Sequence, residues 1–472
     1  MDTDTTRARR WVLALAALAS CMVALDTLVV TTALTTIQRD LDASIASLEW
    51  TVNAYNLSFA VLLMTAAALG DRLGRRRMFA VGLGLFTAAS AACALAPGIG
   101  WLIAARAVQG AGAALVTTLA LALVTRAFPP ERRGAALGVF FGATGLAVAS
   151  GPLVGGALAE GIAWQWIFWL NVPIGLLTIP LALRRIDESF GPDTGLDVPG
   201  LALVTGGAFG LVWGLVRGNA AGWASTEVLA ALLGGALLLA AFVVWEHRAR
   251  EPMVPLAFFR SRAFSAGNAS IFFAIASLFG AVFFFAQFLQ VGLGHSPFDA
   301  GLRLLPWTGT LFVVAPIAGA LVDRFGERPF MVAGLTLQAV GMAWIAQVAE
   351  PGVAYVALVP PLVIAGCGVS MTFPAAQNSV VSAVPPEAIG KAAGVNSTMR
   401  ELGGVFGVAI AVAVFAGAAG PGAGYASPQA FTDGFGPAIT ASALLAAAGA
   451  LAGLGLPGRR RAPERDAVAV EA

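Results

Sequence analysis

The feature that most constrains this chain is a nearly unbroken series of apolar stretches, each long enough to cross a lipid bilayer. A transmembrane helix needs about 20 mostly apolar residues. Because the stretches are long and lack the period-two alternation of barrel strands, they predict helices rather than a membrane β-barrel. We predict fourteen helices, at 11–36, 48–69, 78–97, 101–125, 134–159, 165–183, 198–217, 228–246, 264–290, 301–322, 329–348, 353–374, 393–418 and 436–456.

Charged residues are too scarce for a soluble protein. They make up 11% of the chain, against about 25% in soluble domains. This composition leaves too little polar surface to cover a soluble body of 472 residues, and it excludes disordered, collagen-like and coiled-coil chains. The first apolar stretch is too long for a signal-peptide core, so we expect it to be a retained helix.

The placement of basic residues predicts the orientation in the membrane. With the N-terminus in the cytoplasm, 23 of the 28 basic residues fall in cytoplasmic segments. Only Arg39, Arg217 and Arg303 fall in outer loops, and Arg106 and Arg400 lie within helices. An even number of helices agrees with two cytoplasmic termini. We therefore expect a multi-pass protein of a bacterial cytoplasmic (inner) membrane, with the lipid bilayer as its surroundings.

Two pairs of similar segments indicate an internal repeat. Ala67–Arg77 (AALGDRLGRRR) resembles Gly319–Pro329 (GALVDRFGERP), and Asp71 and Asp323 differ by 252 positions. Pro129–Val139 (PPERRGAALGV) resembles Pro385–Val395 (PPEAIGKAAGV) at an offset of 256. Two parallel six-helix repeats around a midplane site are typical of secondary transporters. We predict a six-helix bundle at 1–185, two inserted helices with linkers at 186–262, a second six-helix bundle at 263–458 and a cytoplasmic tail at 459–472.

Four motifs support a family resemblance. They are Leu69-Gly70-Asp71-Arg72-Leu73-Gly74-Arg75-Arg76 after the second helix; Leu102, Arg106, Gln109 and Gly110 in the fourth; Gly151-Pro152-Leu153-Val154-Gly155-Gly156 in the fifth; and Trp164-Gln165-Trp166-Ile167-Phe168 with Asn171-Val172-Pro173-Ile174-Gly175 near the sixth. With these motifs the chain resembles the major facilitator superfamily, specifically its fourteen-helix drug:proton antiporter branch. Ala67 and Ala147 stand where that family has glycine.

Asp26 and Arg106 are the charged residues expected deepest in the membrane, where a charge costs about 2.5–3.5 kcal/mol. Asp26 lies about 20 Å from the outer marker Arg39, and Arg106 lies about 13 Å below the same side. Contact between them, direct or through water, is therefore feasible. We predict that Asp26 carries the proton and that Arg106, with Gln109 one turn away, tunes its proton affinity. The alternatives are a structural polar residue for Asp26 and a bundle anchor for Arg106.

The second half has no counterpart of this pair, because an offset of 252 from Asp26 and Arg106 leads to Leu278 and Leu358. Arg400 and Glu401 are adjacent in the thirteenth helix. They are interpreted either as a structural ion pair or as a second protonation site.

The two short cytoplasmic loops of the repeat are predicted to act as gates. By resemblance, Asp71, Arg72, Gly74 and Arg75 hold the two halves in one conformation, and Asp323, Arg324 and Gly326 do the same in the second half. Glycine permits a tight turn at Gly74. The alternative is that the arginines only determine topology.

Gly151, Pro152, Gly155 and Gly156 form the antiporter motif, and by resemblance this region seals the cavity during exchange. From the residues alone, small side chains at this spacing predict close helix packing, and Pro152 predicts a kink. Gly403 and Gly407 repeat the spacing in the thirteenth helix.

Candidate residues of a substrate cavity are amides, aromatics and a methionine, which suit variable apolar ligands. The alternative for each is contact with lipid or with a neighbouring helix. The candidates are Asn53, Asn56, Phe272, Phe273, Gln287, Gln290, Met371 and Phe373.

These observations predict a proton-coupled antiporter that exports small hydrophobic or cationic compounds by alternating access. The alternatives are a dedicated exporter or facilitator of one endogenous metabolite, and a non-transporting receptor or scaffold. The spacing of Cys21, Cys93 and Cys367 fits neither a disulfide nor a metal site, and no nucleophile or nucleotide motif is present. We expect no enzyme activity, no metal and no cofactor beyond the proton gradient. The expected partners are a small-molecule substrate and protons, with no nucleic acid, and the protein is expected to be monomeric.

Overall fold

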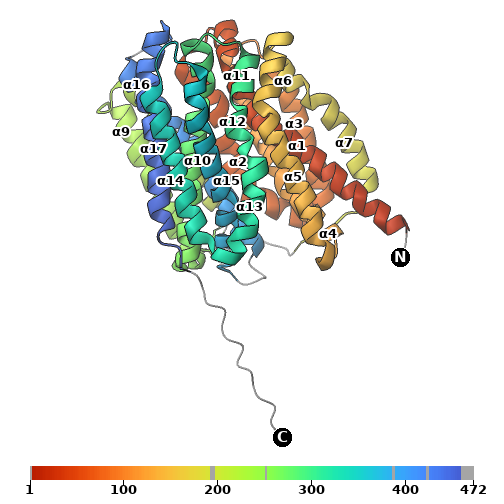
Figure 1. The fold of residues 1–472 in the computed structure, drawn as a ribbon. Helices are drawn as coiled ribbons and strands as arrows, with labels where there is room; N and C mark the ends of the chain where they lie inside the picture. Colours follow the sequence, from red (N-terminus) through yellow and green to blue (C-terminus); the bar gives the residue numbers. More distant parts are fainter. Residues whose placement is uncertain are drawn as a thin grey trace.

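The computed structural model describes residues 3–191, 197–249, 252, 254–384, 389–420 and 425–458. These residues fold into helices joined by short turns (Figure 1). The predicted tail at 459–472 and part of the second repeated segment, 385–388, lie outside the described residues. The first half contains α1 (Thr3–Leu41), α2 (Ile45–Leu73), α3 (Arg75–Ala94), α4 (Ile99–Ala127), α5 (Pro130–Gly161), α6 (Trp166–Trp169) and α7 (Asn171–Arg185).

Two helices follow, α8 (Val198–Ala221) and α9 (Thr226–Arg248), and then the short turn η1 (Leu256–Arg260). The remaining elements are α10 (Arg262–Gln287), η2 (Phe288–Gly292), α11 (Pro297–Arg303), α12 (Leu305–Thr308), α13 (Thr310–Phe325), α14 (Glu327–Val348), α15 (Tyr355–Val381), α16 (Ile389–Ala419) and α17 (Pro428–Gly453). We refer to α1–α7 as the N half and to α10–α17 as the C half.

Each of the fourteen predicted stretches coincides with a helix or a continuous run of helices. Twelve of them satisfy the length and hydropathy of a membrane span as they stand. Two more, α2 and α5, are bent by 52° and 42° and raise the number to fourteen if each bent pair is one span. The structure therefore supports twelve to fourteen candidate spans in an all-helical fold.

The helices of each half pack mainly on one another. In the N half, α4 lies against α2 and α3, and α1 lies against α5, α4 and α7. In the C half, α10 lies against α16 and α17, and α14 lies against α15 and α17. The pair α8 and α9 packs on itself, with α8 also in contact with α2 and α16 (Figure 1).

A repeated glycine contact relates the two halves. A Cβ atom on Gly155 would lie 2.3 Å from the Val29 carbonyl oxygen of α1, and one on Gly407 would lie 2.0 Å from the Ala276 carbonyl oxygen of α10. Gly151, which also packs on α1, and Gly407 are 256 positions apart, the offset that relates Pro129–Val139 to Pro385–Val395. The packing of α5 on α1 is therefore repeated by α16 on α10, and both contacts require a residue without a side chain.

The start of α1 and the end of α17 lie at the same end of the bundle (Figure 1). We call the opposite end the distal end. The halves meet there: Gln290 accepts a hydrogen bond from Thr35 Oγ1 at 2.5 Å and donates one to the Thr32 carbonyl at 3.1 Å. The amide of Phe298 also donates to Glu160 at 3.0 Å.

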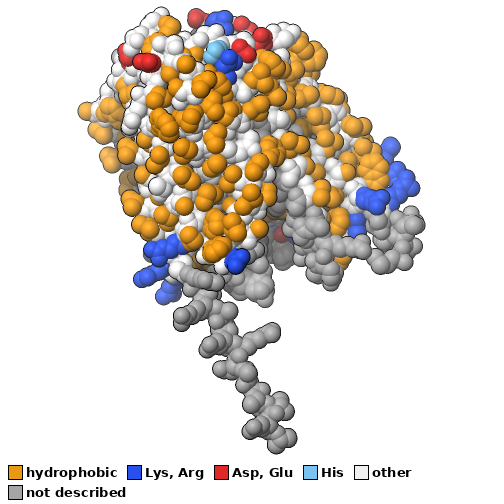
Figure 2. Space-filling view, in the orientation of Figure 1, with side chains coloured by type: hydrophobic (Ala, Val, Ile, Leu, Met, Phe, Trp, Pro, Cys, Tyr) orange, Lys and Arg blue, Asp and Glu red, His pale blue; other side chains and the backbone are white. Residues whose placement is uncertain are grey.

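The surface matches a body surrounded by lipid. Figure 2 shows hydrophobic side chains along the sides of the bundle and charged side chains gathered toward its two ends. Lys and Arg dominate the end that carries the start of α1, whereas the distal end shows Asp and Glu together with Lys or Arg and His. Charges at the ends of apolar helices remain in contact with water or lipid headgroups.

Candidate functional site

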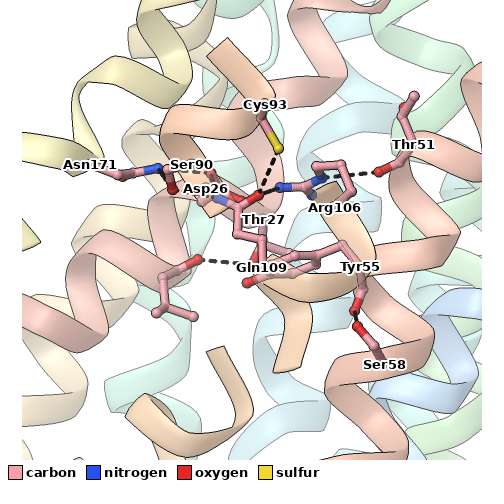
Figure 3. Close-up of polar contacts among 11 residues, drawn as sticks. Asp26, Thr27, Thr51, Tyr55, Ser58, Ser90, Cys93, Arg106, Gln109 and Asn171 are labelled. Atoms are coloured by element: carbon pink, nitrogen blue, oxygen red, sulfur yellow. Dashed lines mark hydrogen bonds and ion pairs between the residues drawn. The ribbon is translucent and has the colours of Figure 1, made fainter. Parts of the chain in front are cut away.

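Asp26 lies inside the N half, where side chains from two helices, α4 and α7, bind its carboxylate (Figure 3). It is 0% exposed. Its Oδ2 atom accepts a hydrogen bond from Arg106 Nη1 at 2.5 Å. Its Oδ1 atom accepts from Gln109 Nε2 and from Asn171 Nδ2, each at 3.0 Å. The carboxylate is therefore ion-paired on one oxygen and doubly hydrogen-bonded on the other.

The guanidinium of Arg106 is held on several sides. Its Nε donates to the carbonyl of Thr51 at 3.0 Å, and its Nη1 also donates to Gln109 Oε1 at 2.7 Å. The ring of Tyr55 lies 4.1 Å from Arg106 Cζ, and the ring of Phe168 lies at 5.8 Å. These cation–π contacts stabilise the charge away from water.

A second layer of polar groups fixes the two amides. Ser90 Oγ accepts from Gln109 Nε2 at 2.8 Å and from Asn171 Nδ2 at 3.3 Å. The Cys93 thiol lies 3.7 Å from Gln109 Oε1 and donates to it. The complete network draws on α1, α2, α3, α4 and α7, and we call it the Asp26 network.

Glycines on α4 bring these helices close enough to interact. A Cβ atom on Gly110 would lie 2.3 Å from the Tyr55 carbonyl oxygen of α2, and one on Gly112 would lie 2.6 Å from the Phe86 nitrogen of α3. Because α4 fits tightly between α2 and α3, Arg106 reaches the backbone of α2 and Gln109 reaches α3.

Asp26 and Arg106, which were predicted to lie at similar depths in the membrane, are in direct contact. Arg106 and Asp26 form an ion pair in which the two side chains are 1% and 0% exposed. Their part in proton transfer remains a prediction. Asn171 was not among the predicted partners of Asp26, although it begins the motif Asn171–Gly175.

The first predicted gating loop is docked on its own half. Gly74, with φ of 105°, ends α2 and precedes α3, so it forms the tight turn that was predicted. Asp71 pairs with Arg75 at 2.7 Å. The segment after α7 covers this loop, because the Gly191 amide donates to the Asp71 carbonyl at 3.0 Å and the Arg75 amide donates to the Ser189 carbonyl at 2.8 Å. Arg72 is exposed.

Glu188, in the same segment, caps the start of α3. Its carboxylate accepts from the backbone amides of Arg76 at 2.9 Å and Arg77 at 3.3 Å. A carboxylate at a helix N-terminus is favourable because it meets unpaired amides and the positive end of the helix dipole. Sequence analysis did not identify this residue.

The second predicted gating loop has the same turn. Gly326 lies between α13 and α14 with φ of 87°. The guanidinium of Arg324 lies 5.5 Å from the centroid of the Phe325 ring. The side chain of Asp323 lies outside the described residues.

The antiporter motif packs on both halves. Cβ atoms on Gly151 and Gly155 would approach α1, the first at 3.1 Å from Leu28 Cβ. A Cβ atom on Gly156 would lie 2.3 Å from the Pro297 carbonyl oxygen of α11, in the C half. Helix α5 bends by 42° between Gly142–Val148 and Ser150–Gly161, one turn before Pro152. The predicted packing and kink are both confirmed.

The structure places the predicted substrate-cavity residues in different parts of the bundle. Phe272 and Phe273 form an edge-on pair at 5.4 Å, and Phe273 faces Gly449 of α17. Met371 packs against Gly334 of α14, and Phe373 packs against a hydrophobic cluster in the C half. Gln287 accepts a hydrogen bond from Tyr425.

Of the remaining candidates, Asn53 and Asn56 are buried in α2. Gln290 lines a cavity of about 640 Å³ at the distal end. Arg400 and Glu401 form an ion pair at 2.9 Å.

Comparison with known proteins identifies relatives over most of the chain. The sequence profile of the Major Facilitator Superfamily matches residues 16–408. The chain is 36% identical to the tetracenomycin C resistance and export protein of Streptomyces glaucescens, over 86% of this chain and 76% of that protein. It is 35% identical to the multidrug resistance protein Stp of Mycobacterium tuberculosis, over 84% of this chain and 74% of that protein.

A solved structure has the same fold. It is a bacterial homologue of the human lysosomal transporter Spinster in an inward-facing, unoccupied conformation, with a TM-score of 0.67 over 95% of this chain and 98% of that one. The sequence identity is 17%, so the likeness concerns the fold alone.

Proposed function

The chain belongs to the major facilitator superfamily, a family of membrane transporters rather than enzymes, and from that premise we propose that it is a proton-coupled drug exporter. In this proposal it moves small hydrophobic or cationic compounds out across a bacterial cytoplasmic membrane in exchange for protons. It has fourteen transmembrane helices with both termini in the cytoplasm, and it works as a monomer by alternating access.

The observation that carries the proposal is the buried Asp26–Arg106 ion pair. Removing one partner of a buried ion pair typically costs 3–5 kcal/mol, because the remaining charge is left without compensation. A buried carboxylate that depends on one arginine therefore responds strongly to movement of that arginine. Such a response is what coupling of proton binding to conformation requires.

The surrounding amides make the exchange of a proton feasible. Gln109 and Asn171 donate to Asp26 Oδ1, so they favour the ionised carboxylate in this conformation. If α1, α4 and α7 shift relative to one another, these donors withdraw and the carboxyl group gains affinity for a proton. We propose that the proton taken up in this way returns to the cytoplasm during each export cycle.

The contacts between the halves support a closed distal end in the present conformation. Gln290 bridges to Thr32 and Thr35, and the antiporter motif meets α11 through Gly156. We propose that these contacts are the extracellular gate. In the alternate conformation they would separate, and the loop at Asp71–Arg75 would leave the segment after α7 to latch onto the C half.

The names of the relatives allow two interpretations of the range of substrates. The name of the Mycobacterium protein refers to multidrug resistance, whereas that of the Streptomyces protein refers to a single antibiotic. A dedicated exporter of one metabolite is therefore the second candidate function, and it would use the same proton site.

The test is expression in a bacterial strain that lacks its own efflux pumps. We expect resistance to several unrelated hydrophobic or cationic compounds, together with dye efflux that stops when a protonophore is added. Resistance to a single compound would favour the dedicated exporter. Unchanged efflux after the protonophore would contradict proton coupling.

A further inference from the structure

Three buried polar side chains form a stripe along one face of α2. Glu49, Asn53 and Asn56 are 0%, 0% and 1% exposed. Their spacing of four and then three residues places them on the same helix face. Asn53 Nδ2 donates to Glu49 Oε1 at 2.8 Å. We call these three residues the α2 stripe.

The stripe contains polar atoms that the described protein does not satisfy. Glu49 Oε2, Asn53 Oδ1 and Asn56 Nδ2 are buried without a hydrogen-bond partner among the described residues. Buried polar atoms are almost always paired, because each unpaired atom loses its hydration without compensation. Three on one helix face indicate a place where another polar group binds.

The stripe faces the C half. The residues that flank it on α2 belong to two hydrophobic clusters, and each cluster includes residues of α16. On one side these are Leu48 and Val52 with Val408 and Val412, and on the other Leu57 and Ala60 with Val405 and Ala409. Because α2 packs directly against α16, the stripe lies on a helix of the interface between the halves, where alternating access would open the bundle.

No basic residue in the described part of the chain forms an ion pair with Glu49. The helices that pack against α2 carry the following charged residues: Asp4, Arg7, Arg9, Arg10, Asp26, Arg39 and Asp40 on α1, Arg75, Arg76 and Arg77 on α3, Arg106 and Arg126 on α4, Arg217 on α8, and Lys391, Arg400 and Glu401 on α16. Arg106 pairs with Asp26, Arg217 with Glu227 and Arg400 with Glu401. Arg75 pairs with Asp71 at the opposite end of α2, where Arg76 and Arg77 contact Glu188.

The surroundings of Glu49 select the kind of cation that fits. Buried apolar side chains accompany Glu49 on α2: Leu48, Val52, Leu57 and Ala60. A carboxyl group among apolar side chains offers a counter-charge to a cation that is itself lipophilic. Small hydrated ions would gain less, because they would lose their water to apolar walls.

We propose that Glu49 is the counter-charge for a lipophilic cationic substrate and that Asn53 positions its carboxyl group. This inference rests on the proposed function, since the stripe becomes accessible when the halves separate. Glu49 stays neutral while the interface is closed, because an unpaired carboxylate there is costly. On arrival of the cation, the carboxyl group releases its proton to water, and the resulting carboxylate pairs with the substrate.

The experiment is equilibrium binding of radiolabelled tetraphenylphosphonium to the purified full-length protein. Glu49→Gln keeps the size of the side chain and an acceptor for Asn53 but cannot ionise. We expect it to weaken tetraphenylphosphonium binding at least tenfold, whereas Glu49→Asp, which keeps the charge, stays within about threefold of the wild type. Glu246→Gln is the matched control, because Glu246 is a buried glutamate on α9 that accepts from the Val254 amide.

Each result decides the proposal. It is overturned if the wild-type protein does not bind tetraphenylphosphonium, if Glu49→Gln binds it as well as the wild type does, or if Glu49→Asp binds as weakly as Glu49→Gln. Binding is measured without transport, so the outcomes separate the two ideas. If the protein exports drugs but binding does not depend on Glu49, the proposed function stands and the Glu49 proposal fails. If binding depends on Glu49 but no efflux is seen, the cation site stands and the proposed export function fails.

Discussion

The two halves share a helix scaffold but differ in what that scaffold encloses. In the N half, α1 carries Asp26 into a network with Arg106, Gln109 and Asn171. At the repeat offset, the C half has Leu278 and the fully buried Leu358 in place of Asp26 and Arg106. Both halves use glycine contacts to set the helix packing, at Gly151 and Gly155 of α5 and at Gly407 of α16. Packing and charge are therefore separable parts of this fold.

This difference indicates in which half a movement of the helices changes the environment of a buried charge. The C half can reorient without exposing a buried ion pair of its own at the Leu278–Leu358 positions. The N half cannot reorient around Asp26 without changing the environment of a carboxylate. We infer that proton coupling is confined to the N half, and the C half contributes gating and substrate contacts.

The largest expected effect comes from breaking the buried pair. Arg106→Gln should lower the stability by about 3–5 kcal/mol, because it leaves the Asp26 carboxylate buried without its counter-charge. Asp26→Asn combined with Arg106→Gln should recover most of this loss, since no charge then remains. Thermal unfolding of the purified variants measures both. If the double variant is no more stable than Arg106→Gln, the ion pair is not the source of the cost.

The next effect tests whether the scaffold is equivalent in the two halves. Gly155→Ala and Gly407→Ala each place a Cβ atom within 2.3 Å or 2.0 Å of a carbonyl oxygen on the neighbouring helix. We expect both to destabilise the protein to a similar extent, about 1–3 kcal/mol, because α5 and α16 must move away from α1 and α10. If only one of the two substitutions lowers the stability in the same unfolding assay, the helix contacts in the two halves are not equivalent.

A smaller effect is expected at the two gating turns. Gly74→Ala and Gly326→Ala force a side chain onto residues with φ of 105° and 87°, at about 1–2 kcal/mol each. Gly74→Ala should cost more, because its Cβ atom would also lie 2.7 Å from the Glu188 carboxyl carbon. Adding Glu188→Ala should then remove part of the steric clash. Equal melting temperatures for the two glycine variants would argue against docking of Glu188 on this loop.

The smallest effect concerns a titratable group at the distal end of the C half. Partial burial and the nearby Arg303 lower the pKa of His295, with Asp299 acting in the opposite direction. The unfolded chain therefore binds a proton at higher pH than the folded protein does. Stability from this group is present above about pH 6.5 and declines below it. His295→Gln should flatten this part of the stability–pH curve, and an unchanged slope would exclude the effect.

Much of the fold was predictable, because the length of each apolar stretch in the sequence indicates the length of a membrane helix. All fourteen stretches coincide with helical segments, and the depth of Asp26 and Arg106 followed from counting residues along their helices. The tight turns at Gly74 and Gly326 and the kink near Pro152 were also local properties. Each of these depends on a residue and its neighbours in sequence.

The rest could not be predicted, because it depends on contacts between distant residues. Asn171 binds Asp26 across 145 positions, and Gly156 meets Pro297 in the other half. Glu49 lies near the start of a helix, and that position does not reveal whether a side chain points to water or to α16. Phe373 as a cavity residue stays a prediction, and in the structure this residue packs against a hydrophobic cluster of the C half.

The central claim is that Asp26, in the N half, couples transport to the proton gradient. The direct test is substrate accumulation in proteoliposomes driven by an imposed pH gradient, with Asp26→Asn compared with Leu278→Asn at the repeat-related position. We predict that the wild type and Leu278→Asn accumulate substrate and that Asp26→Asn only equilibrates it across the membrane. Gradient-driven accumulation by Asp26→Asn at the wild-type level would contradict the claim.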